Sequence, residues 1–181
     1  YLSQAKTERE CVSLLVKLAK ENGYRELDEY KELKPNDKIV IPYMNKCIAM
    51  FHIGNKKWEK GMNILGAHID SPRMDVKQNP LYESEELAYL DTHYYGGIKK
   101  YQWVTQPLAI HGVVVKKDGQ KVEIQIGEKE DDPVFVITDL LVHLSSSQLN
   151  KSASMVIEGE NLDVLIGSQA SEAEKEAVKA N

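Results

Sequence analysis

Two polar side chains stand where an apolar stretch of the chain ends. Residues 63–67, Asn-Ile-Leu-Gly-Ala, are followed by His68 and Asp70, and Pro72 comes next but one. In α/β folds, functional side chains gather at the carboxyl ends of strands. Residues i and i+2 of an extended segment also point to the same side. We therefore predict that His68 ligates a metal ion and that Asp70 accepts its other ring N–H, which fixes the tautomer.

A simpler interpretation fits the same residues. His68 can be a surface histidine, and Asp70 can begin the turn that Ser-Pro completes, so His-x-Asp by itself does not establish a metal site. In the metal interpretation, Ile69 faces the core and Pro72 stiffens the exit from the strand. The choice between the two depends on the residues around them.

The other histidines give weaker signals. His52 and His111 lie in strand-like stretches and are interpreted as structural. His93, beside Tyr-Tyr-Gly-Gly, and His143, on the apolar face of a predicted helix, are candidates for the substrate side of a site. Packing is the alternative for both. The sequence contains no Gly-x-Ser-x-Gly elbow, phosphate-binding loop, dinucleotide fingerprint or His-Glu-x-x-His motif.

Composition argues against several classes of protein. The chain has 181 residues, of which 23 are basic and 28 acidic, so its formal net charge is -5. Without a basic stripe, neither a nucleic-acid nor a membrane partner is expected. No apolar run approaches the roughly 20 residues that span a bilayer. The N-terminus lacks the layout of a signal peptide, and Cys11 and Cys47 lie in apolar stretches. We therefore expect reduced core thiols in a cytoplasmic protein.

The first part of the chain predicts an α/β arrangement. Thr7 and Glu10 form a capping box, apolar residues recur at helical spacing behind them, and Gly23 provides the stop, which predicts a helix over 7–22. Strands are predicted at the following ranges: 38–42, 47–53 and 62–67. Because the last is almost continuously apolar, we expect a central sheet that is covered on both faces.

The pattern changes after Pro80 to that of a β-rich module. Residues 81–90 are acidic and predicted to be irregular, and Gly96-Gly97 permits a turn within an aromatic stretch. The other expected elements are strands at 108–115, 122–126 and 134–137, a helix at 139–149, short apolar pieces at 155–157 and 162–166, and a capping box at 171–174. A domain boundary is predicted near residues 80–90, which gives domains 1–85 and 86–181.

Several motifs together resemble one family. They are Gly66-Ala-His-Ile-Asp-Ser-Pro-Arg73, Thr92-His-Tyr-Tyr-Gly-Gly-Ile-Lys-Lys-Tyr-Gln-Trp103, Pro107-Leu-Ala-Ile-His-Gly-Val-Val114, Asp132-Pro-Val-Phe135 and Asp139-Leu-Leu-Val-His-Leu144. In this order they look like a bacterial member of the aspartyl aminopeptidase family, peptidase family M18, which includes the vacuolar aminopeptidase I type. The resemblance extends over nearly the whole chain.

The resemblance implies both a fold and an activity. Members of the family are dinuclear zinc exopeptidases that remove the N-terminal residue of peptides. Their catalytic domain is a three-layer α/β/α sandwich, which a β-rich lid and oligomerisation domain interrupts. By resemblance, His68 is the first ligand of the two zinc ions and Asp70 is its orienting catalytic carboxylate. The two ions share a water, a glutamate acts as general base, and hydroxide attacks the scissile carbonyl.

Two departures from the family pattern limit these expectations. Members are more than twice as long, so the other ligands and the general base have no counterpart here. We therefore expect an N-terminal fragment that is inactive alone. Animal-type members also carry a lid histidine that reaches a neighbouring subunit's active site, and Ser147 stands at that position. The alternative function is a non-catalytic binding or assembly module that mediates homo-oligomerisation through its β strands.

Overall fold

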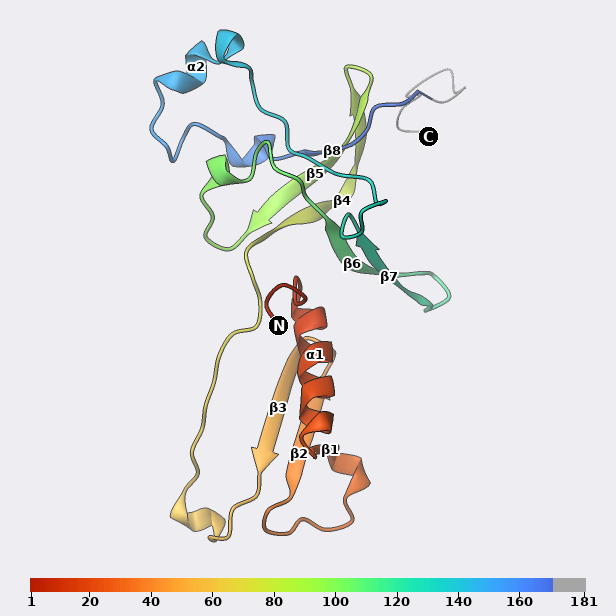
Figure 1. Ribbon diagram of the computed structural model, residues 1–181, viewed down its shortest axis with the longest axis vertical. Coiled ribbons are helices and arrows are strands. Elements are labelled where there is room, and N and C mark those ends of the chain that lie inside the picture. The colour runs from red at the N-terminus through yellow and green to blue at the C-terminus, as the bar shows by residue number, and fades with distance from the viewer. Residues whose placement is uncertain (171–181) are drawn as a thin grey trace. The chain divides into compact units, whose positions relative to one another are not determined.

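The structure is a computed structural model that describes residues 1–170, and its chain folds as two compact units (Figure 1). The first unit is Tyr1–Ser71 and the second is Pro72–Asn181. The sequence predicted a domain boundary near residues 80–90, drawn at 85/86, which lies in a tight turn between two paired strands. The division into domains 1–85 and 86–181 stays a prediction. The roles of the two parts, catalytic domain and lid, stay predictions.

The first unit begins with helix α1 (Glu8–Glu21), as the sequence predicted. The Thr7 hydroxyl accepts a hydrogen bond from the backbone N–H of Glu10 at 3.3 Å, and the Glu10 carboxylate accepts one from the N–H of Thr7 at 2.9 Å. This capping box satisfies N–H groups that would otherwise lack a partner in the helix. Gly23 follows the helix with a φ of 82°, a conformation that favours glycine.

A three-stranded sheet accompanies α1 in the order β1-β2-β3. Strand β1 (Arg25–Glu26) runs parallel to β2 (Lys38–Tyr43), and β2 is antiparallel to β3 (Cys47–His52). The predicted strands at 38–42 and 47–53 are thus confirmed. Three residues, Met44 to Lys46, connect these strands, and Met44 and Asn45 have φ of 51° and 54°. Positive φ at both positions suits the twist of the paired strands.

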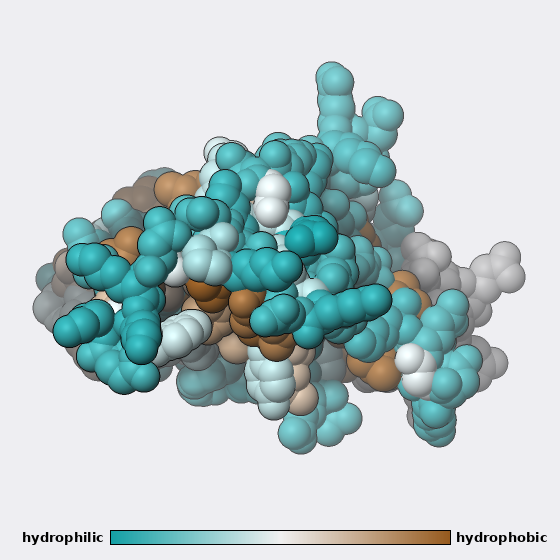
Figure 2. All heavy atoms as spheres, turned by 90° about the horizontal axis from the view of Figure 1, so that it is seen from below, coloured by the Kyte–Doolittle hydropathy of each residue, from teal (hydrophilic) through white to brown (hydrophobic). Residues whose placement is uncertain are grey.

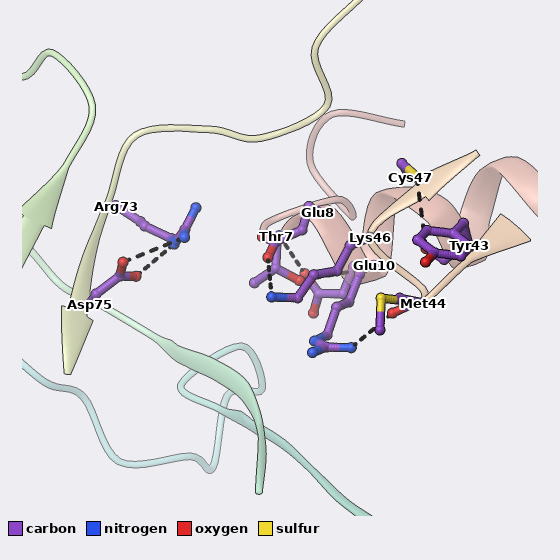
Figure 3. Close-up of polar contacts among 10 residues, drawn as sticks. Thr7, Glu8, Glu10, Tyr43, Met44, Lys46, Cys47, Arg73 and Asp75 are labelled. Atoms are coloured by element: carbon purple, nitrogen blue, oxygen red, sulfur yellow. Dashed lines mark hydrogen bonds and ion pairs between the residues drawn. The ribbon is translucent and has the colours of Figure 1, made fainter. Parts of the chain in front are cut away.

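Polar contacts tie the start of α1 to the β2–β3 turn (Figure 3). Arg9 donates a hydrogen bond to the backbone oxygen of Met44 at 3.5 Å, and Lys46 lies 3.9 Å from Glu8. Both contacts are at the surface, where an ion pair contributes at most about 1 kcal/mol. The packing of the helix therefore depends mainly on its buried residues, which are Cys11, Val12 and Ala19.

The two cysteines differ in their surroundings. Cys11 is buried, as expected, but Cys47 is exposed, and both are free thiols. Cys47 was predicted to be a core thiol because its strand is apolar. It begins β3 at the hairpin turn, where its Sγ lies 3.9 Å from the backbone oxygen of Tyr43. The apolar pattern of a strand thus did not establish which of its side chains are covered.

The strand predicted at 62–67 is absent from the structure. These residues have no regular secondary structure, and Ile64 and Leu65 are 80% and 99% exposed. A strand requires a neighbouring strand for its backbone hydrogen bonds. No strand among residues 1–170 pairs with this stretch. The sheet covered on both faces that its apolar run predicted is therefore not seen in residues 1–170.

The second unit is built on a long hairpin. Strand β4 (Arg73–Ser84) pairs antiparallel with β5 (Leu87–Tyr95), and β8 (Val164–Gly167) adds to β5. Residues 81–90 were predicted to be irregular, which is wrong. The turn residues Glu85 and Glu86 adopt φ of 52° and 59° without the glycine or asparagine that usually marks such a turn. The sequence therefore offered no turn signal.

Part of the remaining β prediction is confirmed. Strands β6 (Ile110–Val115) and β7 (Lys121–Ile126) pair antiparallel, and exposed and partly buried residues alternate along β7. Gly119 in the intervening turn has a φ of 85°. The predicted strand at 134–137 forms only isolated bridges, Leu108 to Phe135 and Val136 to Leu165. The predicted capping box at 171–174 lies outside the described residues.

The helix predicted at 139–149 is largely wrong. Only a 3₁₀ turn, η4 (Val142–Leu144), and a single-turn helix, α2 (Ser146–Leu149), occur there. Helical spacing stabilises a helix when its apolar face is covered. Here the large apolar side chains are half or more exposed: Leu140, Leu141, Val142, Leu144 and Leu149. The other 3₁₀ turns of the described residues are η1 (Leu27–Glu29), η2 (Trp58–Lys60), η3 (Lys100–Gln102) and η5 (Gly159–Asn161).

The core of the second unit joins segments that are distant in sequence. Its buried residues are Phe135, Ile137, Ile157, Leu162 and Val164. Above it, the buried Thr92 hydroxyl donates to the backbone oxygen of Leu162 at 2.5 Å, and the Tyr82 hydroxyl donates to Asp163 at 2.6 Å. Burial, and then the Asp163 carboxylate, raise the pKa of Tyr82 well above its ordinary value. These contacts fix β8 against the β4–β5 hairpin.

A single carboxylate organises the turn after β7, and this predicts a pH-dependent effect. Asp132 accepts hydrogen bonds from the backbone N–H groups of Gly127, Glu128 and Lys129 at 2.9, 3.1 and 3.1 Å. The bonds from Lys129 and Gly127 are the main cause that lowers the pKa of Asp132. Because the folded pKa is the lower one, its stabilisation is present above the ordinary carboxyl pKa of about 3.9 and is lost as pH falls through the folded value.

We expect Asp132→Ala to lower the denaturant midpoint of the second unit at pH 7 and to have a smaller effect in strong acid. The measurement is urea unfolding at both pH values. Asp131→Ala serves as the control, because the neighbouring Asp131 is exposed and makes none of these backbone contacts. An Asp132→Ala effect that is equally large at both pH values would rule out this ionic contribution.

Candidate metal centre

His68 and Asp70 lie together as their spacing predicted. The Nδ1 atom of His68 is 3.0 Å from the backbone oxygen of Asp70 and 3.3 Å from its Oδ1. Both neighbours are acceptors, so the neutral ring carries its proton on Nδ1 and presents the lone pair of Nε2. The His68 side chain is 84% exposed. Ile69, which was expected to face the core, is only partly buried, because the strand that would have carried it does not form.

This arrangement fits one corner of a zinc site. An imidazole whose other ring nitrogen is held by a carboxylate or a backbone carbonyl is the usual form of a zinc-binding histidine. Catalytic zinc normally has three protein ligands. Within residues 1–170, however, no group of three or more His, Cys, Asp or Glu side chains lies close enough to hold a metal ion. The described residues thus supply one oriented metal-ligating nitrogen, Nε2 of His68, but not an enclosed metal site.

The two substrate-side candidates belong to the second unit. His93 is exposed on β5, where its backbone pairs with that of Asp75 and its ring stacks on Tyr94 at 5.3 Å between centroids. His143 is exposed in η4. Neither is buried in packing, which was the alternative for both. Their role toward a substrate stays a prediction.

The histidines interpreted as structural have different surroundings. The His111 side chain is only 7% exposed, and its Nε2 lies 2.9 Å from a carboxylate oxygen of Glu128. It therefore links β6 to the turn after β7, as a structural histidine would. His52 ends β3 and is exposed, so its place in a strand is confirmed but it is not packed into the core.

Sequence reasoning missed a cluster at the start of β4. Arg73 donates to both carboxylate oxygens of Asp75, at 2.6 and 3.4 Å (Figure 3). Its guanidinium also lies 4.2 Å from the centre of the Tyr95 ring. The strand pairing sets Arg73 opposite Tyr95. A bidentate ion pair with a cation–π contact fixes a guanidinium more firmly than either contact alone. The signal was the Arg-x-Asp alternation, which puts both side chains on one face of a strand.

Comparison with known proteins settles the family. A model of the family described as aminopeptidase I zinc metalloprotease (M18) matches residues 1–181. The chain belongs to the M18 family. The resemblance that the motifs indicated is thus confirmed. It covers both the stretch that ends in His68 and Asp70 and the β-rich second unit.

Individual M18 proteins match closely but are much longer. M18 family aminopeptidase 1 of Clostridium acetobutylicum is 58% identical over 93% of this chain, which covers 37% of that protein. The Thermotoga maritima relative is 44% identical over the whole chain, which covers 40% of it. Among solved structures, the T. maritima M18 aminopeptidase has a TM-score of 0.92 at 45% identity. Aminopeptidase I of C. acetobutylicum has a TM-score of 0.86 at 52% identity.

These two solved structures contain this chain's fold within a longer chain. The chain aligns over 99% of its length with both, and covers 39% and 41% of theirs. The mixed α/β class predicted from the sequence is confirmed at that level.

No helix among residues 1–170 is long and apolar enough to cross a membrane.

Proposed function

We propose that this chain is the part of a cytoplasmic zinc aminopeptidase that supplies the first metal ligand and the lid. The observation that carries the proposal is the His68–Asp70 pair, which holds Nδ1 and presents Nε2, in a chain that belongs to the M18 family throughout. The substrates are peptides with a free N-terminus. The relatives, named as aminopeptidases, support this reaction class.

The two units receive separate roles in this proposal. Tyr1–Ser71 is part of a three-layer α/β/α catalytic domain, and the unit from Pro72 onward is the β-rich lid and oligomerisation domain. The exposed stretch at 62–67 supports the first role, because an apolar segment of this kind requires neighbouring strands that residues 1–170 do not provide. His93 and His143, exposed on the second unit, are the candidates to contact the substrate.

Each residue of the metal corner has a definite task. Asp70 accepts a hydrogen bond from the Nδ1–H of His68, which keeps one ring orientation and leaves the lone pair of Nε2 for a metal ion. Two zinc ions, when bound, supply Lewis acidity and lower the pKa of a water. The remaining ligands and a glutamate general base are provided by polypeptide outside this chain. The chain alone is therefore inactive.

The first test is zinc binding by this chain. Because one oriented imidazole cannot enclose an ion, we expect titration calorimetry to show only weak binding that His68→Ala reduces further. His52→Ala is the matched control, since His52 is also exposed but has no carboxylate or carbonyl on its ring in the described structure. Tight, stoichiometric zinc binding by this chain would contradict the proposal that the other ligands lie elsewhere.

Assembly is the second candidate function, and a specific observation favours it. Residues 140–144 place four large aliphatic side chains at the surface, each at least half exposed. Contiguous exposed apolar surface of this kind marks interaction sites. We expect multi-angle light scattering after size-exclusion chromatography to show a metal-independent homo-oligomer, which Leu141→Ser with Leu144→Ser would dissociate. A monomer at all concentrations would rule out assembly by this chain alone.

A further inference from the structure

A cationic hollow in the first unit is formed by residues other than the His68–Asp70 pair. Lys56, Lys57 and Lys60 line a hollow of about 500 Å³, a volume within the range of small-molecule sites. In residues 1–170, none of these three ammonium groups pairs with a carboxylate. Other lysines of the same structure do have carboxylate partners: Lys20, Lys46, Lys77 and Lys151. Glu59 lies in the same turn and lowers the local net charge, but within residues 1–170 no ion pair joins it to the three lysines.

Local structure holds the three lysines around one turn. The segment contains η2 (Trp58–Lys60), in which the N–H of Lys60 donates to the carbonyl of Lys57 at 3.0 Å. The N–H of Gly61 then donates to the carbonyl of Trp58 at 2.9 Å, and its φ of 90° is a conformation that favours glycine. The lysine backbones are thus ordered by the turn instead of lying along an extended strand.

The same turn exposes an aromatic ring. Trp58 lies between the lysines in sequence and is 62% exposed. Such exposure of a tryptophan is unusual, because its large apolar surface is normally covered. Figure 2 shows that hydrophilic residues, in teal, make up most of the surface on the face seen from below. Trp58 does not line the hollow, but its exposed indole lies in the same turn as Lys60 and is available to a ligand for stacking.

We propose that this hollow binds a small polyanion that carries two or more phosphate groups. Three ammonium groups around one volume repel each other, and a multiply charged anion removes that repulsion while gaining three attractions. Lysine acts as a point-charge ligand of phosphate. The whole chain has a net charge of -5, so its overall charge does not attract anions, and binding would depend on these local lysines. The proposal is independent of zinc, of His68 and of peptide hydrolysis.

Titration of this chain with sodium pyrophosphate and tripolyphosphate tests the proposal, with calorimetry and Trp58 fluorescence as the two readouts. Trp103→Phe leaves Trp58 as the reporter, because the chain has two tryptophans. We expect saturable 1:1 binding, tighter for tripolyphosphate and weakened by salt. The triple variant Lys56→Gln, Lys57→Gln, Lys60→Gln should bind about tenfold or more weakly, as expected for losing several screened charge contacts.

A matched triple variant separates a site from general charge attraction. Lys99→Gln, Lys116→Gln and Lys117→Gln remove the same charge from three lysines of the second unit. The proposal is supported if only the hollow variant loses affinity while both variants keep the wild-type denaturant midpoint. Equal losses in both variants, or no saturation at millimolar polyanion, would overturn it. Polyanion binding that is retained in His68→Ala would show that binding does not depend on the candidate metal ligand.

Discussion

His68→Ala is expected to abolish hydrolysis of aminoacyl-nitroanilide substrates by the full-length M18 enzyme, with a loss in kcat/KM of well over about 100-fold. The reason is that Nε2 of His68 is the donor that the structure presents, with Nδ1 engaged by Asp70. Groups that only orient a zinc ligand typically contribute about 10–100-fold in activity or affinity, so loss of a ligand itself should exceed this range. Initial rates and zinc content by mass spectrometry are the two measurements.

Asp70→Asn provides a graded companion to this variant. The closest acceptor of the His68 Nδ1 proton is the backbone oxygen of Asp70 at 3.0 Å, and the carboxylate is farther at 3.3 Å. The substitution keeps the backbone acceptor. We therefore expect kcat/KM to fall by about tenfold, the lower end of the range for groups that orient a zinc ligand. His52→Ala should retain wild-type activity. Full activity in His68→Ala would exclude this histidine as a metal ligand.

Leu162→Ala is expected to lower the free energy of unfolding of the second unit by about 2–5 kcal/mol, the range for removing a fully buried leucine. Leu162 is 0% exposed and packs in the cluster with Phe135 and Ile137, while its backbone oxygen accepts the Thr92 hydroxyl. A cavity there weakens the core that joins β8 to the hairpin. Urea unfolding followed by Trp103 fluorescence, in a Trp58→Phe background, reports on this unit because Trp103 packs against the same cluster.

Leu149→Ala is the matched control for that experiment. It removes the same atoms from a side chain that is 67% exposed and lies outside residues 140–144, so its effect on unfolding should stay within about 0.5 kcal/mol. A similar midpoint shift in both variants would mean that burial in the described structure does not determine stability at these positions.

Local sequence determined the elements that depend on near neighbours. Helix α1 was readable from its capping box and Gly23, and β6–β7 from alternation around Gly119. The His68–Asp70 contact was readable for the same reason, because i and i+2 share a side in an extended chain. Hence both the position and the tautomer of the candidate ligand followed from a few consecutive residues.

Burial and long-range pairing could not be read in the same way. The apolar runs at 62–67 and 139–149 predicted a strand and a helix, but these elements require a partner surface that the described chain does not provide. The β4–β5 hairpin was missed because Glu85 and Glu86 make its turn without a glycine. The prediction of secondary structure thus failed where an element depends on contacts with residues distant in sequence.

The contacts of Thr92 and Tyr82 with Leu162 and Asp163 show most clearly what the sequence could not predict. These contacts join residues 70 and 81 positions apart, so no local pattern announces them. The sequence by itself determined the family, the first helix and the oriented histidine, because these depend on motifs or on neighbours along the chain. Only the tertiary structure decided the core and the unit boundary at Ser71, because burial depends on which distant residues come together.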